Sequence, residues 1–69
     1  MSDHVYKVSE IVGTSHKSAD DAIKSAIARA SKSLRNIRWF EVKHVRGSVD
    51  GKGGIQYQVT LNIGFTLDD

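Results

Sequence analysis

The chain contains no cysteine, so neither disulfides nor thiolate metal sites can stabilise it. Long apolar runs are also missing, since no segment approaches the roughly twenty apolar residues that a membrane-spanning helix needs. The first residues, MSDHVYKVSE, lack the basic region and apolar stretch of a secretory signal. We therefore expect a soluble cytoplasmic protein. Its 69 residues predict a single domain, 1–69, with a small core that association between subunits would support.

Motifs for catalysis are equally scarce. The chain has no nucleophile elbow, no HExxH motif and no Walker loop. Its histidines, His4, His16 and His44, fall on separate predicted elements without metal-ligand spacing. Asp20 and Asp21 stand where a helix begins, and this position accounts for both carboxylates without a metal. We therefore predict neither enzymatic activity nor a metal site.

Acidic residues are rare in the middle of the chain. Between Lys24 and Arg46 there are seven basic residues and one acid, Glu41. Such a stretch could face nucleic acid, membrane phosphates or a phosphorylated ligand. Alternatively, acids at the start of a helix and bases at its end complement the helix dipole and need no ligand. Both interpretations remain open at this point.

The first half of the chain predicts a strand followed by a helix. Residues 5–12, VYKVSEIV, are typical of a strand, which Gly13-Thr14-Ser15 would end. Ser18, with Asp21 three residues later, resembles a capping box. Apolar residues then recur in steps of three and four, which predicts a helix of about five turns. They are Ala22, Ile23, Ala26, Ile27, Ala30, Leu34 and Ile37.

The second half predicts a hairpin. A strand over about 38–49 is followed by a glycine-rich loop, 50–54, and by a third strand in which apolar and neutral polar residues alternate without a break from 55 to 67. A helical crossover makes the first two strands run in the same direction, and the hairpin reverses the third. We therefore predict an α+β fold of β-α-β-β order, with a three-stranded antiparallel sheet in the order 1-3-2. Gly64 indicates a bend or a close backbone approach.

The third strand also lacks charge. No charged residue lies between Gly53 and Leu67 on either face, over roughly 40 Å at about 3.3 Å per residue. A long uncharged strand surface in water favours association. Because one helix covers only one face of a sheet, we expect the other face to be at least partly buried in an assembly.

Trp39 is the only tryptophan, and it falls out of phase with its apolar neighbours Phe40 and Val42. It should therefore project from the outer side of the sheet, together with Gln58. An indole beside a side-chain amide suits a flat heterocycle with a polar rim. Alternatively, the indole simply fills a contact between subunits.

Three segments, EIVGTS (10–15), DDAIKSAIARASKSLRNIRWFEV (20–42) and YQVTLNIGFTLD (57–68), resemble the dodecin family of small flavoproteins. This resemblance implies a hollow dodecamer in which sheets partly wrap their helices and flavins stack in pairs between tryptophans of neighbouring subunits. It implies that Trp39 is the stacking residue and that Gln58 hydrogen-bonds the edge of the flavin ring. Arg46, in the segment VRG, would lie near the flavin and meet a phosphate or ring oxygen; the alternative is a plain exposed charge.

The resemblance also implies a function. We expect a cytoplasmic homododecamer that stores flavin and protects it from photochemical damage, with FMN favoured by Arg46 and riboflavin or FAD as alternatives. Neither nucleic acid nor a membrane is an expected partner. The main alternative is a small basic nucleic-acid-binding module in which Trp39 stacks on a base. A structural shell that has lost its ligand is the third reading.

Overall fold

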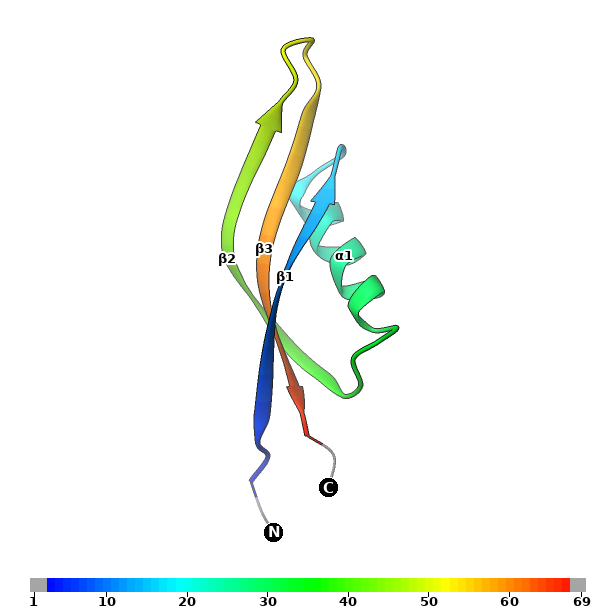
Figure 1. Ribbon diagram of the computed structural model, residues 1–69, viewed down its shortest axis with the longest axis vertical. Helices are drawn as coiled ribbons and strands as arrows, with labels where there is room; N and C mark the ends of the chain where they lie inside the picture. The colour runs from blue at the N-terminus through cyan, green and yellow to red at the C-terminus, as the bar shows by residue number, and fades with distance from the viewer. Residues whose placement is uncertain (1–2, 68–69) are drawn as a thin grey trace.

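The computed structural model describes residues 3–67. Three strands form one antiparallel sheet with the last strand in the middle, in the order β1-β3-β2, and Figure 1 shows the single helix lying against one face of this sheet. The predicted fold class, strand order and element order are therefore confirmed. The elements are β1 (Tyr6–Ser15), α1 (Ala19–Ala30), β2 (Ile37–Val49) and β3 (Ile55–Thr66).

Strand β1 is longer than predicted. Gly13 and Ser15 do not end it, because they pair with Val59 and Tyr57 of β3. Gly13 has a different purpose: a Cβ atom there would collide with the carbonyl oxygen of Ala22 and the methyl group of Ala26. The glycine thus lets α1 lie directly on the backbone of β1.

Half of the predicted capping box is present at the start of α1. The Ser18 hydroxyl accepts a hydrogen bond from the backbone N–H of Asp21 at 3.0 Å. The Asp21 carboxylate, however, accepts from the Ser15 hydroxyl at 2.7 Å, and Ser15 Oγ accepts the backbone N–H of Lys17 at 2.9 Å. Ser15 therefore ties the end of β1 to the beginning of the helix.

The end of α1 corrects the prediction of about five turns, because the helix stops at Ala30. The Ser31 hydroxyl donates to the carbonyl oxygen of Ile27 at 2.8 Å, a local bond that competes with helix propagation. Asn36 then adopts a φ angle of 63°, a left-handed conformation that asparagine tolerates better than most residues. Ile37 consequently begins β2 instead of extending the helical stripe.

The core lies between α1 and the strands β1 and β3. Val59, Leu61 and Ile63 of β3 are fully buried, and each contributes about 1.5–3 kcal/mol through removal of its apolar surface from water. Ala22 and Ala26 of α1 meet Val59 and Leu61 at close range. Strand β2 lies outside this cluster, and its hairpin with β3 extends past the helix (Figure 1).

Candidate functional site

The strand register decides which side chains share a face, because paired residues in an antiparallel sheet point to the same side. Leu61 and Ile63 point toward α1, on what we call the inner face; alternate residues such as Gln58 and Gly64 therefore lie on the outer face. Trp39 pairs with Gly64, and Arg46 pairs with Gln58. The outer-face position predicted for Trp39 and Gln58 is confirmed, and Arg46 joins them.

A β-bulge puts Arg46 on that face. Strict alternation along β2 would send it to the inner face with Phe40 and Val42. Instead, the register shifts between Val42 and His44, so Lys43 is an extra residue and the alternation changes phase. The sequence carries a signal for this change of phase: Phe40 and Val42 occupy even positions, whereas Val45 and Val49 occupy odd positions.

The indole of Trp39 lies over Gly64. A Cβ atom at Gly64 would overlap the ring carbons of the indole, so the close approach predicted at this glycine is confirmed and its partner is Trp39. The Tyr6 ring flanks the indole with 6.1 Å between ring centroids and 58° between planes. Trp39 nevertheless remains 38% exposed. The indole thus rests on the strand backbone and keeps accessible surface for a planar partner.

A cluster of polar side chains lies farther along the outer face, away from Trp39. Arg46 Nε donates to Gln58 Oε1 at 2.9 Å, and Gln58 Nε2 donates to Gln56 Oε1 at 3.1 Å. These bonds fix the orientation of the Gln58 amide, since its oxygen faces Arg46 and its nitrogen faces Gln56. The arrangement presents a guanidinium and two oriented amides to the solvent side of the sheet.

The stacking residue and the amide are not neighbours within one chain. Gly64 and Gln58, which mark their positions on β3, are six residues apart, or about 20 Å at 3.3 Å per residue. Trp39 and Gln58 of one copy therefore cannot contact the same ring system. Alternation predicted their common face correctly, but it carries no information about position along the strand.

The middle of the outer face holds two carboxylates, each bonded to a side chain of another strand. Lys43 Nζ lies 2.7 Å from Glu10 Oε2, and Asn62 Nδ2 donates to Glu41 Oε1 at 3.5 Å. The hydrogen bond and the charge of Lys43 lower the pKa of Glu10, and Glu10 in turn raises the pKa of Lys43. This ion pair spans β3, because its partners belong to the two outer strands.

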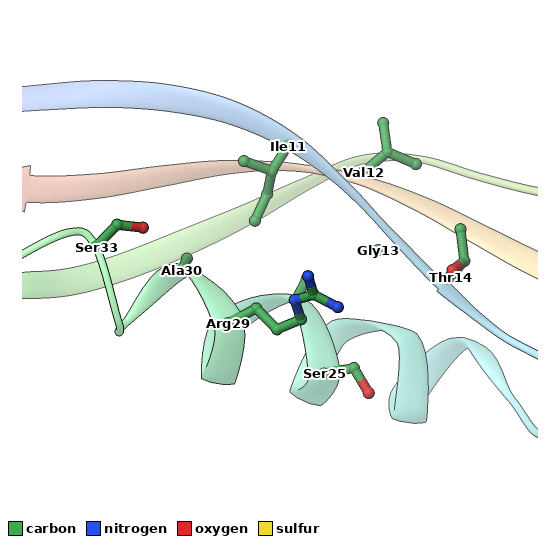
Figure 2. Close-up of a pocket in the computed structure, with 9 residues that line it drawn as sticks. Ile11, Val12, Gly13, Thr14, Ser25, Arg29, Ala30 and Ser33 are labelled. Atoms are coloured by element: carbon green, nitrogen blue, oxygen red, sulfur yellow. The ribbon is translucent and has the colours of Figure 1, made fainter.

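A groove in the surface lies away from these residues. Its volume is about 640 Å³ and it lies between β1 and α1; Figure 2 shows the Arg29 side chain on α1, on the side that faces β1. Its lining contains hydroxyl, methyl and guanidinium groups but no aromatic ring. It cannot serve as a stacking site for a planar ligand, so the outer face is the better candidate.

Residues 3–67 contain neither a membrane-spanning helix nor a cluster of metal ligands. Over this range no helix is long and apolar enough to cross a membrane. Nor do three His, Asp or Glu side chains gather there in a way that would hold a metal ion.

Comparison with known proteins places the chain in a family. The family model "Dodecin" matches residues 5–68. The dodecin of Thermus thermophilus is 49% identical over 65 residues, which cover 94% of each protein. A solved structure of dodecin from Streptomyces davaonensis, 47% identical, superposes with a TM-score of 0.93 and covers 99% of this chain and 100% of that one.

A more distant relative has calcium in its name. The structure of calcium dodecin from Mycobacterium tuberculosis, described as calcium chelating with a novel calcium-binding site, is 38% identical and has a TM-score of 0.84. It covers 93% of this chain and 91% of its own. The family match over almost all described residues, together with these relatives, shows that this chain belongs to the dodecin family.

Proposed function

We propose that this protein binds flavin and stores it as stacked pairs between the subunits of a homododecamer, without turning over a substrate. One observation carries the proposal: in a chain of the dodecin family, the only tryptophan lies across Gly64 on the outer face and keeps accessible surface. A half-exposed indole held flat on a strand is a ready platform for a planar aromatic ring.

Each candidate residue has a distinct part in this proposal. Trp39 stacks on the flavin ring, an interaction that contributes about 1–3 kcal/mol in comparable base–aromatic platforms. Gln58 offers donor and acceptor groups to the polar rim of the ring, and Arg46 meets a phosphate or ring oxygen. Because about 20 Å separates Trp39 from Gln58 along β3, a complete site takes residues from two subunits.

The uncovered flank of the sheet supports assembly. On the inner face of β2, Phe40, Val42 and Val45 are 40–57% exposed, because α1 lies over the other two strands. Neighbouring apolar side chains exposed on one strand are typical of surfaces that a partner covers. A second copy of the chain is the partner that we propose.

Photoprotection follows from the stacking. An electron-rich indole in contact with the ring would drain the excited state of the flavin, quench its fluorescence and limit photochemical damage. FMN is the preferred ligand in this proposal because Arg46 supplies a positive charge for the phosphate, and riboflavin is the alternative. Calcium, the ligand named for one relative, is not part of this proposal.

Titration of the purified protein with FMN tests the proposal. We expect the fluorescence of bound flavin to be strongly quenched and the complex to elute with the mass of a dodecamer. Trp39→Ala should keep the dodecamer but weaken flavin binding by about 10- to 100-fold, as expected for a lost stacking platform, and Trp39→Phe should retain part of the affinity.

Three outcomes would contradict this proposal in different ways. If the wild-type protein takes up no flavin, storage is wrong. Strongly fluorescent bound flavin would exclude photoprotection while leaving binding intact. Salt-sensitive binding of oligonucleotides without flavin uptake would instead favour a nucleic-acid-binding module based on the basic stretch from Lys24 to Arg46.

A further inference from the structure

The β-bulge at Lys43 brings a second basic side chain to the outer face. After the bulge, His44 pairs with Thr60 and Arg46 pairs with Gln58. Two residues along a strand span about 7 Å, so the imidazole and the guanidinium project from the same face at neighbouring positions. Side chains of this length can reach one common anion at that spacing.

Arg46 has capacity left for such an anion. Its Nε donates to Gln58 Oε1 at 2.9 Å, which holds the guanidinium on the outer face. Within the described chain no bond engages its two terminal nitrogens. A guanidinium anchored at one nitrogen still offers the paired N–H groups that match phosphate oxygens.

The charges around His44 favour an anion. On β1 and β3, the residues next to it across the sheet are neutral: Val12, Thr60 and Gln58. Arg46 and Lys43 are its cationic neighbours on β2, and α1 lies on the other face.

One acid interacts with His44: the pKa of Glu10 is lowered by its hydrogen bond to Lys43 and, to a smaller extent, by the charge of His44. Glu10 of β1 is tied to Lys43 at 2.7 Å, and Glu41 of β2 accepts from Asn62 at 3.5 Å. From Thr60 to Gln56, the described outer face has no acidic side chain. A phosphate there would meet positive charge and hydrogen-bond donors, while the carboxylate of Glu10 is engaged by Lys43.

We infer that His44 and Arg46 together recognise the phosphate of FMN, so that the preference for FMN over riboflavin rises when His44 is protonated. This inference rests on the proposed function and deepens it by naming a residue that sets specificity. Riboflavin lacks the phosphate and serves as the reference ligand, because every contact with the ring is common to both flavins.

The pH dependence has two sources that must be separated. A histidine gains its charge near pH 6.5, whereas a phosphate monoester loses its second charge below about pH 6. The two changes oppose one another in the wild-type protein. A variant without the imidazole charge reports the titration of the phosphate alone, and the difference between the two proteins isolates His44.

The test measures dissociation constants of FMN and riboflavin for the full-length protein at about pH 5.5 and about pH 8, on either side of the ordinary histidine pKa. The readout is the ratio of the riboflavin constant to the FMN constant. At the lower pH the wild-type ratio should exceed that of His44→Gln by about two- to fivefold, the range expected for an exposed charge pair. At the higher pH the two ratios should coincide.

Two further variants test whether the effect comes from the charge at position 44 and whether removing any histidine would produce it. His44→Lys carries a permanent charge and should keep the ratio above that of His44→Gln at both pH values. His16→Gln removes a histidine from the connection between β1 and α1 and should behave as the wild type. Size-exclusion chromatography at both pH values checks that the assembly is unchanged.

The outcomes distinguish the two proposals. If the ratios of wild type and His44→Gln agree at both pH values while both flavins bind, this inference is wrong and the storage function stands. If the wild-type protein binds neither flavin, the storage function itself fails. Equal effects of His44→Gln on riboflavin and FMN would also overturn the inference, because they would assign His44 to the ring or to folding.

Discussion

The two strands that flank β3 differ in what covers them. Strand β1 lies under α1, with Gly13 in direct contact with the helix, whereas β2 exposes Trp39 on one face and Val45 on the other. Strand β1 therefore contributes to the core of the chain, whereas in the proposed function β2 supplies the surfaces for flavin and for a second subunit. Under that proposal, folding and recognition depend on opposite edges of one small sheet.

The largest effect is expected from a change that breaks the β1 flank. Gly13→Leu would drive a side chain into the Ala22 carbonyl and the Ala26 methyl group. Overpacking costs about 1–3 kcal/mol and more where backbone must move, which is comparable to the whole stability of a domain of this size. When thermal unfolding is monitored by circular dichroism, we expect the cooperative transition to be lost.

Gly47→Ala is the matched control for this prediction. A Cβ atom there would meet the Gln56 carbonyl oxygen at 3.3 Å and no helix atom, so the fold should persist. Native-like melting of Gly13→Leu would show that α1 does not need the close contact.

The next largest effect should separate assembly from folding. Val45→Asp puts a charge on the exposed inner face of β2, where the wild-type side chain is 57% exposed. Burying that carboxylate against a second subunit would be strongly unfavourable, while the single chain loses little. We expect the variant to elute as a smaller species with unchanged circular dichroism.

Lys52→Asp, at the tip of the hairpin, controls for added negative charge and should still assemble. An intact assembly of Val45→Asp would mean that this face of β2 stays outside the interface.

A smaller effect should sharpen the link between Gly64 and Trp39. Gly64→Ala changes none of the side chains proposed to contact flavin but displaces the indole of Trp39 from the strand. We expect flavin affinity to fall about tenfold, within the range of a disturbed stacking platform. Asn62→Ala, on the same face of the same strand, should change affinity less. Unchanged affinity for Gly64→Ala would show that the resting position of the indole is irrelevant to binding.

The smallest effect concerns the ion pair that joins the two flanks. Lys43 lowers the pKa of Glu10, so this contribution to stability is present above the ordinary glutamate pKa and is lost as pH falls through the lowered value. Glu10 raises the pKa of Lys43, so the contribution is also lost as pH rises through that raised value.

Lys43→Met should therefore lower the melting temperature slightly at neutral pH, and its difference from the wild type should vanish in strong acid. Both groups are exposed, so the shift should be the smallest of the four. Lys52→Met removes a lysine without this partner and should not reproduce the pH dependence. A difference that persists in strong acid would assign the effect to packing of the lysine stem.

The sequence was informative where one periodic pattern determined the outcome. The unbroken alternation around Leu61 predicted the central strand and its buried face, and Ser18 predicted the start of the helix. Prediction failed where the same residue or pattern was compatible with two structural explanations. Gly13 looked like the end of a strand but allows the helix to pack, and the apolar residues Leu34 and Ile37 continued a helical stripe after Ser31 had ended the helix.

For the candidate site, the sequence predicted the face on which Trp39 and Gln58 lie but not their positions along the sheet. Alternation placed Trp39 and Gln58 on one face, yet their separation depends on register, which the sequence does not state directly. The position of Arg46 depended on the extra residue Lys43. Long-range pairing determines both features, and local propensity carries little information about it.

Because Lys43 is an extra residue in β2, the alternation of side chains before it does not determine which face the later side chains occupy. If β2 kept Lys43 but paired with β3 without the bulge, every later side chain of β2 would turn over, so that Arg46 would face inward and Val45 outward. The bulge between Trp39 and Arg46 is therefore as much a part of the chemistry of this protein as the identity of either residue.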